Sequence, residues 1–298
     1  NYIKSNLISG VCTSIHKQVN CLDLSCGRGG DIKKYINPDN NVIFLLGLDI
    51  EDVNEASKRF YFEKRKPLGI FLQADTSKNI KNKECCESNE HSKYMIDILY
   101  GLSKTFPERY VDNGIYKRYK EKAKQGFDLI SSQFTLHYYL ENEEKFNGFL
   151  NNISENINDG GYFIATFYDG SILYELLKEQ DKLEYKDEDD NLIYKIEKKF
   201  AEIDTDFKYE EGNNSNMFGN KISVYMDSIG KEFNEYLVNL DFLIASMKER
   251  GLELVTPKPN GKYNNIFSDD CMIKKGHGSF ANLIKKLPQI MTYCVLSA

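Results

Sequence analysis

The chain has 298 residues, of which 41% are hydrophobic and 28% are charged, and its formal net charge is −6. This length and composition suit a globular protein built as one large domain or two small ones. The negative charge argues against a protein that binds nucleic acid by charge alone, but it leaves room for a localised basic groove. We see neither an apolar run long enough to span a membrane nor a signal peptide.

The seven cysteines are odd in number, and no two of them form a C-x-x-C pair. We therefore expect buried or free thiols in a reducing compartment, and neither a disulfide framework nor a zinc site. The chain starts abruptly at Asn1 without an initiator Met, so we also expect it to be a module of a longer polypeptide.

Residues 1–17 are the first predicted helix, because apolar side chains recur there at helical spacing. Lys4 lies on the other side of this helix, where the simplest interpretation is a solvated surface lysine. The apolar run Val19–Leu24 then predicts a short buried strand. A glycine turn, Gly27–Gly30, and a helical pattern from Asp31 follow it. Strand, turn and helix together direct backbone N–H groups and a helix N-terminus at a ligand.

A second buried strand, Val42–Asp49, ends in a carboxylate. An acid at this strand tip can accept both hydroxyls of a ribose, as in nucleoside sites on doubly wound sheets. The dinucleotide fingerprint would require glycine at position 32, where the sequence has Ile32. A pyrophosphate clamp is therefore disfavoured, and the pattern indicates a nucleoside cofactor of another kind.

The third predicted strand, Gly69–Asp75, also ends in an acid. Asp75 is equally well interpreted as an acceptor for an adenine amine or as the N-cap of a following helix. Residues 76–126 are polar and lysine-rich around an apolar patch, Tyr94–Tyr100. The basic run Tyr116–Lys124 has interleaved tyrosines and could follow an RNA backbone, but a solvated helix face is the favoured interpretation.

The fourth predicted strand, residues 126–132, is followed directly by an aromatic cluster that contains Phe134, His137 and Tyr138. A lone histidine usually belongs to a core or a loop. These residues, however, follow the carboxyl end of a strand, where open sheets bind ligands. Their ring faces and hydrogen-bond donors suit a flat purine.

The rest of the chain departs from simple strand–helix alternation. Residues 179–191 are acidic and are expected to be exposed. We found no internal repeat or low-complexity linker. The remaining predicted elements are a helix over 146–157, a helix-ending turn at Asp159–Gly161, a strand over 162–167, two strand-like pieces within 221–240, a helix over 242–250, a strand-like run at 252–255 and a final strand over 290–296.

Several motifs in this order resemble those of mRNA cap guanine-N7 methyltransferases. They are D-L-S-C-G-R-G-G-D, G-L-D-I, Q-A-D-T-S, S-S-Q-F-T-L-H-Y, G-G-Y-F-I-A-T and F-N-E-Y-L-V. The resemblance spans nearly the whole chain, and its most specific part is S-S-Q-F-x-x-H-Y. The continuation Tyr168-Asp169-Gly170 is more similar to the capping enzymes of large cytoplasmic DNA viruses, in which the methyltransferase is the C-terminal module of a longer protein.

The resemblance implies an α/β fold of the class I, Rossmann-like methyltransferase kind. Its mostly parallel twisted sheet would have helices on both faces, with inserted and C-terminal strands forming the cap-binding side of a single domain over 1–298. The implied cofactor is S-adenosylmethionine, held by Lys4, Ser25, Gly27, Asp49, Asp75, Gln133 and Phe134. The implied guanine pocket consists of Phe134, His137, Tyr138, Glu235 and Tyr293.

The sequence departs from the family pattern at two positions. Ser25 replaces the usual first glycine of the loop, which a backbone of negative φ tolerates. Tyr168 stands where the cellular enzymes carry a proline in the guanine pocket.

The hypothesis for the reaction is an in-line displacement of the sulfonium methyl by guanine N7. N7 carries a lone pair and no proton, so the reaction requires no general base. Holding N7 about 3 Å from the methyl carbon can supply on the order of 7–11 kcal/mol. In the implied catalytic set of Glu235, Tyr138 and His137, Glu235 would orient the base and offset its developing positive charge.

Three alternatives stay open: a class I methyltransferase acting on tRNA or a small molecule, a non-catalytic stimulatory subunit, and the disfavoured NAD-dependent oxidoreductase. The resemblance implies capped RNA with a GpppN end as the partner, and upstream triphosphatase and guanylyltransferase domains in the same polypeptide. It leaves open whether a stimulatory protein subunit is needed. It implies no metal and no membrane, and a location in the cytoplasm, a viral factory or a virion.

Overall fold

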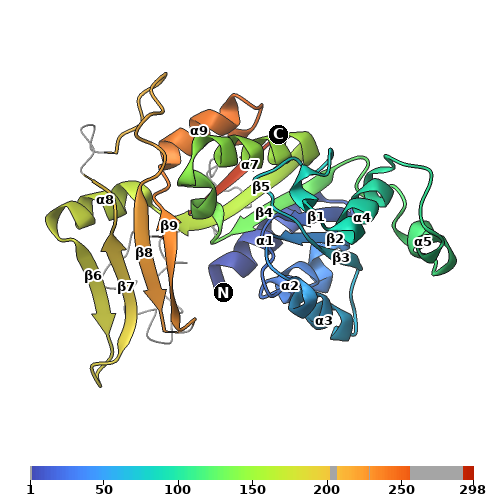
Figure 1. Ribbon diagram of the computed structural model, residues 1–298, viewed down its shortest axis with the longest axis horizontal. Helices are drawn as coiled ribbons and strands as arrows, with labels where there is room; N and C mark the ends of the chain where they lie inside the picture. Colours follow the sequence, from blue (N-terminus) through green and yellow to red (C-terminus); the bar gives the residue numbers. More distant parts are fainter. Residues whose placement is uncertain (1, 202–206, 228, 256–290) are drawn as a thin grey trace. The chain divides into compact units, whose positions relative to one another are not determined.

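The computed structural model describes residues 2–201, 207–227, 229–255 and 291–298 (Figure 1). The chain divides into two compact units, which we describe separately. The first unit comprises residues 1–132, 147–164 and 295–298, and the second comprises residues 133–146 and 165–294.

Helices and strands alternate through the first half of the chain. The described helices are α1 (Tyr2–Ile15), α2 (Ile32–Tyr35), α3 (Asn54–Phe62), α4 (Glu90–Tyr100), α5 (Glu108–Asp112), α6 (Ile115–Tyr119), α7 (Glu143–Asn156), α8 (Gly170–Glu179) and α9 (Leu240–Lys248). The described strands are β1 (Val19–Asp23), β2 (Val42–Asp49), β3 (Leu68–Gln73), β4 (Phe127–Gln133), β5 (Ile157–Tyr168), β6 (Lys182–Lys186), β7 (Leu192–Lys198), β8 (Lys221–Met226), β9 (Lys231–Tyr236), β10 (Glu253–Leu254) and β11 (Met291–Ser297).

The central sheet has the strand order β10-β11-β5-β4-β1-β2-β3. β1 pairs in parallel with both β2 and β4, and β2 pairs in parallel with β3. β2 and β3 therefore follow β1 on one side of the sheet. The chain then returns and places β4 on the other side of β1. The carboxyl ends of β1 and β4 flank this reversal, which is where open α/β sheets bind ligands.

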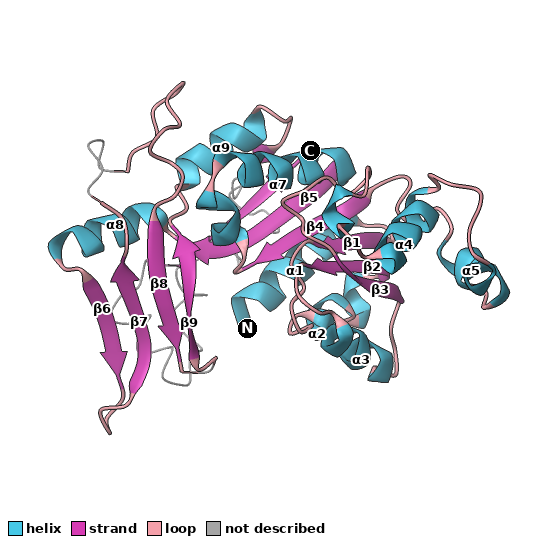
Figure 2. Cartoon of the chain, in the orientation of Figure 1, coloured by secondary structure: helices cyan, strands magenta, loops and turns pink. Residues whose placement is uncertain are grey.

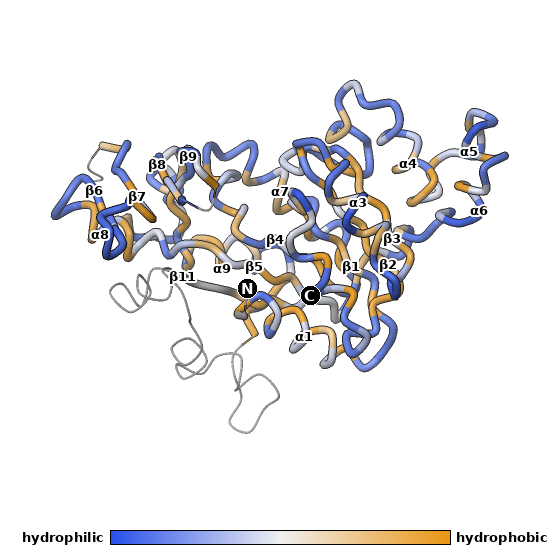
Figure 3. Tube along the Cα trace, turned by 90° about the horizontal axis from the view of Figure 1, so that it is seen from below, coloured by the Kyte–Doolittle hydropathy of each residue, from blue (hydrophilic) through white to orange (hydrophobic). Residues whose placement is uncertain are grey.

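Helices cover both faces of the parallel strands. Figure 2 shows α1, α2 and α3 on one face, and α4 and α7 on the other. Hydrophobic stretches run through the strands and hydrophilic stretches run through the connecting loops (Figure 3). Every residue of β4 is buried, and α1 contributes Leu7, Ile8 and Val11 to the core. This arrangement confirms the predicted α/β fold with a mostly parallel sheet.

The second unit contains an antiparallel sheet of order β6-β7-β8-β9. Figure 1 shows its four strands side by side. Within it, Glu235 of β9 is paired with Ile222 of β8. Glu235 is the buried acid of its strand, whereas Glu232 is exposed.

Most predicted elements lie within a few residues of the observed ones, and one prediction is wrong. Asp159–Gly161 is not a helix-ending turn but part of β5, because Gly160 and Gly161 exchange backbone hydrogen bonds with Ala298. The acidic segment 179–191 is mostly exposed, as expected, and it contains β6 and the turn that leads to β7.

The described residues contain no helix with the length and apolarity needed to cross a membrane. The six cysteines among them are buried and free, in agreement with the expectation of buried or free thiols, and Cys271 lies outside the described residues. Within the same residues, His, Cys, Asp and Glu side chains form no group of three or more that could hold a metal ion.

Helix α7 approaches the turn after β3 very closely at Gly148. A Cβ built on Gly148 would lie 1.8 Å from the backbone carbonyl oxygen of Ser77. Only glycine allows this approach, and the turn that it contacts contains Asp75.

We expect Gly148→Ala to destabilise the protein by about 1–3 kcal/mol, because backbone must move to admit the methyl group. Helix propensity alone predicts the opposite sign, a gain of about 0.5–1 kcal/mol. Denaturant unfolding measures the difference, with Gly30→Ala as a control because a Cβ at Gly30 meets nothing within 4 Å. A stabilised Gly148→Ala variant would contradict the close approach.

Candidate active site

The glycine loop after β1 is held by backbone hydrogen bonds to the neighbouring strands. The Leu24 N–H donates to the Ser131 carbonyl at the end of β4 (3.0 Å), and the Cys26 N–H donates to the Leu48 carbonyl in β2 (2.9 Å). The loop turns through left-handed conformations at Gly27 (φ +50°) and Gly29 (φ +76°). The sequence pattern therefore folds into the predicted strand, turn and short helix, with the loop fixed between two strand tips.

Asp49 contacts this loop directly from the tip of β2. One carboxylate oxygen accepts a hydrogen bond from the Gly27 N–H (2.7 Å), and the other accepts from the Glu51 N–H (3.0 Å). The side chain is half-buried. Because a carboxylate has about four acceptor positions, Asp49 retains capacity for the hydroxyls of a ligand.

Asp75 follows β3 and organises the next turn. Its carboxylate accepts hydrogen bonds from the backbone N–H (3.0 Å) and the hydroxyl (2.6 Å) of Ser77. Asp75 therefore stabilises a turn and does not cap a helix, because the next helices begin after Lys83 and Asn89. The adenine contact remains a prediction.

A small cavity of about 100 Å³ adjoins Asp75 and fits that prediction. Ile50, next to the ribose-side acid Asp49, lines it, and so do the adjacent thiols of Cys85 and Cys86. Ile50 is 61% exposed. An exposed aliphatic side chain beside a carboxylate-lined cavity suits a flat ring that stacks on one face and donates hydrogen bonds at its edge.

Lys4 on α1 forms an ion pair with Asp31 (2.8 Å), which also binds Lys34 (2.6 Å). Burial opposes ionisation of Asp31, but the neighbouring ammonium groups hold its pKa below the usual value. Burial also raises the pKa of Asp23 to about 7, and the charge of Asp31 acts in the same direction. Lys4 is therefore part of a charge cluster at the loop rather than a solvated surface lysine.

The second unit begins where β4 ends, and its first residues are held in a strained arrangement. Phe134 adopts a left-handed backbone (φ +58°), which is uncommon for a residue with a side chain. Its N–H donates to the Thr166 carbonyl (2.8 Å), and the Thr166 hydroxyl donates to Gln133 (3.0 Å). These bonds to β5 keep the Phe134 ring in place, and strain of this type is common at functional sites.

His137 and Glu235 form a buried polar pair without a hydrogen bond between them. Nε2 of His137 lies 3.6 Å from Oε2 of Glu235, beyond hydrogen-bond distance. Both ring nitrogens of His137 and this Glu235 oxygen are buried without a partner among the described residues. Burial lowers the pKa of His137 to about 3 and raises that of Glu235 to about 8. Unsatisfied buried groups of this kind require an explanation, and a polar ligand supplies one.

Aromatic rings surround this pair. The Tyr138 ring packs edge-on against His137 with centroids 4.3 Å apart, and it is 41% exposed at the rim. Tyr168, the departure from the family pattern, lies 5.8 Å from Phe134 and 6.4 Å from His137, measured between ring centroids. Tyr168 is thus part of the cluster, and Tyr194 contacts it from β7. Tyr194 is not among the predicted site residues, because the sequence pattern predicts no element over residues 192–198.

The predicted site residues fall into two groups. In the first unit the structure brings Ser25, Gly27 and Asp49 to one loop and its neighbouring strand tip, with Lys4 beside them and Asp75 at the next strand. In the second unit it brings Gln133, Phe134, His137, Tyr138 and Glu235 into one cluster. The side chain of Tyr293 lies outside the described residues, and its backbone belongs to β11.

The basic run Tyr116–Lys124 overlaps the short helix α6. Its Tyr119 hydroxyl donates to the Gly69 carbonyl (2.9 Å), while Lys117 and Lys122 are exposed. The structure therefore agrees with a mostly solvated surface segment.

The chain matches known proteins over almost its whole length. The model of a family described as the mRNA (guanine-N(7))-methyltransferase domain matches residues 1–292. A probable mRNA-capping enzyme of Acanthamoeba polyphaga mimivirus is 30% identical over 278 residues, which are 90% of this chain and 21% of that protein. An mRNA cap guanine-N(7) methyltransferase of Cryptococcus neoformans is 25% identical over 295 residues, which are 98% of this chain and 39% of that protein. The chain thus spans about a fifth and about two fifths of these relatives.

Solved structures support the fold. An S-adenosylmethionine-dependent methyltransferase from Clostridium acetobutylicum aligns with a TM-score of 0.52 at 15% identity, covering 100% of this chain and 92% of the other. The CcbJ methyltransferase from Streptomyces caelestis also aligns with a TM-score of 0.52, at 11% identity over 98% of this chain and 89% of the other. Together with the family match, which confirms the resemblance drawn from the motifs, these findings establish that the chain belongs to the mRNA (guanine-N(7))-methyltransferase domain family.

Proposed function

We propose that this chain transfers a methyl group from S-adenosylmethionine to N7 of the terminal guanine of a GpppN-capped RNA. The observation that carries the proposal is the buried, hydrogen-bond-deficient pair of His137 and Glu235 inside an aromatic cluster. Membership of the guanine-N7 methyltransferase family supports the same conclusion. In this proposal the whole described chain acts as one methyltransferase module.

The first unit would hold the cofactor. Asp49 would bind the ribose hydroxyls, Asp75 the adenine edge, and the backbone at Ser25 and Gly27 would form the wall beside them. Lys4 would bind the methionine carboxylate beside its ion pair with Asp31. The open space at Gly27, where a Cβ would meet nothing within 4 Å, and the cavity beside Asp75 are consistent with this ligand. When bound, S-adenosylmethionine supplies an electrophilic methyl group. Gln133 and Phe134 would border it, as the family resemblance implies.

The second unit would hold the guanine. Glu235 would accept hydrogen bonds from the N1 and N2 protons, and His137, which burial keeps neutral and which lies 3.6 Å from Glu235, would bind the adjacent O6 on the same side of the ring. Tyr138, Phe134 and Tyr168 would stack on the base. Tyr293 would close the pocket, as the family resemblance implies.

The residues of the chain would act by position and charge. Nothing has to remove a proton from N7, so none of these side chains is required as a general base. Two donors on the guanine favour the ionised form of Glu235, which burial otherwise disfavours. Its negative charge would then offset the positive charge that methylation places on the base.

The direct test is transfer of labelled methyl from S-adenosylmethionine to GpppA-ended RNA, with the methylated position identified. We expect label at guanine N7 and none on uncapped RNA of the same sequence. Label on uncapped RNA or a small molecule would support the rival enzyme class. Cofactor binding without transfer would support a stimulatory subunit.

The proposed context extends to the whole protein. As the family resemblance implies, this module would work beside triphosphatase and guanylyltransferase domains of the same polypeptide, which would provide its GpppN substrate. The expected location is the cytoplasm in which such capping takes place.

We expect Glu235→Ala and Tyr138→Ala to lower methyl transfer to GpppA by at least about tenfold. The loss of one hydrogen bond to a charged group costs roughly 1.5–3 kcal/mol, and stacking contributes a similar amount per base. Calorimetry should show nearly unchanged affinity for S-adenosylmethionine. Glu232→Ala is the matched control, since Glu232 is an exposed acid on the same strand. Lost cofactor affinity in either test variant would contradict the pocket assignment.

We expect Glu235→Gln to unfold at a higher temperature than the parent protein at pH 8.5 and at nearly the same temperature at pH 4.5. Burial raises the pKa of Glu235 from 4.5 to about 8, so the folded protein holds this proton more tightly than the unfolded chain. The contribution of protonated Glu235 to the free energy of unfolding is therefore present at low pH and is lost as pH rises through about 8. This loss is on the order of a few kcal/mol. If the unfolding temperatures of the two proteins differed by the same amount at pH 4.5 and pH 8.5, Glu235 would not be buried as described.

A further inference from the structure

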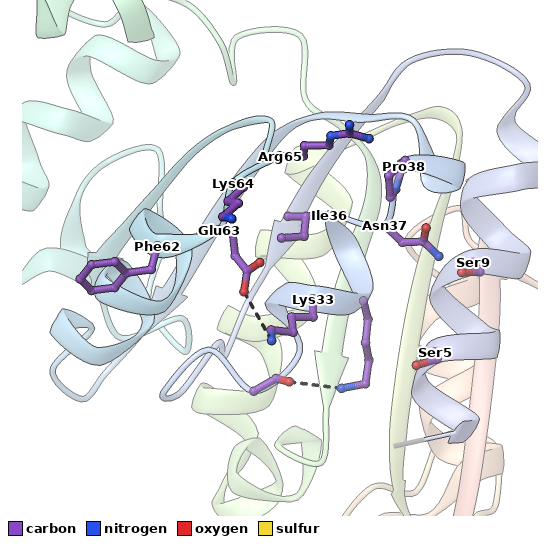
Figure 4. Close-up of a pocket in the computed structure, with 12 residues that line it drawn as sticks. Ser5, Ser9, Lys33, Ile36, Asn37, Pro38, Phe62, Glu63, Lys64 and Arg65 are labelled. Atoms are coloured by element: carbon purple, nitrogen blue, oxygen red, sulfur yellow. Dashed lines mark hydrogen bonds and ion pairs between the residues drawn. The ribbon is translucent and has the colours of Figure 1, made fainter.

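A groove of about 1020 Å³ lies in the helical layer of the first unit, away from the predicted cofactor contacts. Figure 4 shows that residues of α1, α2 and the segment after α3 surround it. Gly30 of the glycine loop lines one part, and Asn37 and Pro38 line another. Because α2 starts beside that loop and the chain turns at Pro38 toward the start of β2, the groove follows α2 from the ligand-binding edge of the sheet toward the opposite edge.

The short length of α2 accounts for the hollow. α2 has a single turn of four residues, whereas its neighbours α1 and α3 have 14 and nine. It contacts both neighbours, but it cannot fill the layer between them. Small side chains of α1, Ser5 and Ser9, face the space that remains (Figure 4).

The groove is strongly basic although the chain as a whole is acidic. Four cations line it, Lys33, Lys34, Lys64 and Arg65, against one acid, Glu63. Lys34 is occupied by its ion pair with Asp31.

The other three cations are available to a ligand. Lys33 is 3.7 Å from Glu63 with 82% of its side chain exposed, and Lys64 and Arg65 form no ion pair with any described residue. Uncompensated cations gathered in one groove attract a polyanion.

Exposed aromatic rings lie at the α3 end of the groove, where the Phe62 ring points away from the other labelled side chains (Figure 4). Phe62 lines the groove and is 77% exposed, and the adjacent Tyr61 is 73% exposed. Their rings meet edge to face with centroids 5.4 Å apart. A basic groove combined with exposed aromatic rings is the combination that binds single-stranded nucleic acid, because phosphates pair with the cations and unpaired bases stack on the rings.

We propose that this groove binds the RNA chain that follows the cap. Lys33, Lys64 and Arg65 bind successive phosphates, and a base stacks on Phe62. The inference rests on the proposed function for the identity of the RNA. The groove would bind the nucleotides that follow the cap, which neither the cofactor site nor the guanine cluster contacts in the proposed function.

The test compares two substrates, the cap analogue GpppA and a capped RNA of about 20 nucleotides. For the double variant Lys64→Glu/Arg65→Glu, we expect KM for the capped RNA to rise by about tenfold or more, with kcat/KM for GpppA changed less than about twofold. The slope of log KM against log salt should fall by about 1 to 1.5, since each lost phosphate contact to a single strand contributes about 0.7. Phe62→Ala should raise KM for the RNA at least about fivefold and leave the salt slope unchanged.

The matched control is Lys117→Glu/Lys122→Glu, the same reversal of two exposed lysines in and beyond α6. We expect it to leave both substrates unaffected. The proposal is overturned if the groove variants leave the RNA KM unchanged, if GpppA activity falls in parallel, or if the control has an equal effect on the RNA. A separate binding measurement with labelled uncapped RNA tests the groove even if the wild-type protein fails to methylate GpppA. Failure of the groove proposal can therefore be distinguished from failure of the proposed function.

Discussion

The hydrogen bond from the Gly27 N–H to the Asp49 carboxylate is the interaction on which the ligand-binding edge of the first unit depends. It is 2.7 Å long and joins the loop after β1 to the tip of β2. Without it, the left-handed turn at Gly27 would have no partner for its N–H, and the acid at the strand tip would have no fixed orientation. The same bond places a carboxylate and a glycine-lined wall side by side, which is the arrangement that a ribose requires.

In the second unit the site depends on an energetically unfavourable burial of polar groups. Glu235 and His137 are removed from water without being given a hydrogen-bond partner, which is unfavourable for folding. The rings of Phe134, Tyr138 and Tyr168 produce this desolvation. A base that presents its polar edge to both groups would replace the water that they have lost, so the burial that weakens the free protein would favour such a ligand.

Hydrophobic patterning was sufficient to predict the central sheet. β1, β2, β3 and β4 are continuous apolar runs that end in polar or acidic residues, and such runs are distinctive of buried parallel strands. β6 and β7 were missed because Leu183 is the buried residue of β6 and the surrounding charge masks the alternation. Glu235 could be identified only through the family motif, because a glutamate in a strand gives no local sign that its side chain is buried. The groove beside α2 also has no sequence signature, since it arises from how little space one helical turn fills.

Position 134 carries a consequence for how this chain can vary. Its left-handed backbone favours glycine, and a branched side chain there would meet its own carbonyl groups. Glycine at this position would relax the backbone but would remove a ring whose centroid lies 5.8 Å from that of Tyr168. The chain can therefore release this torsional strain only by giving up one member of the aromatic cluster.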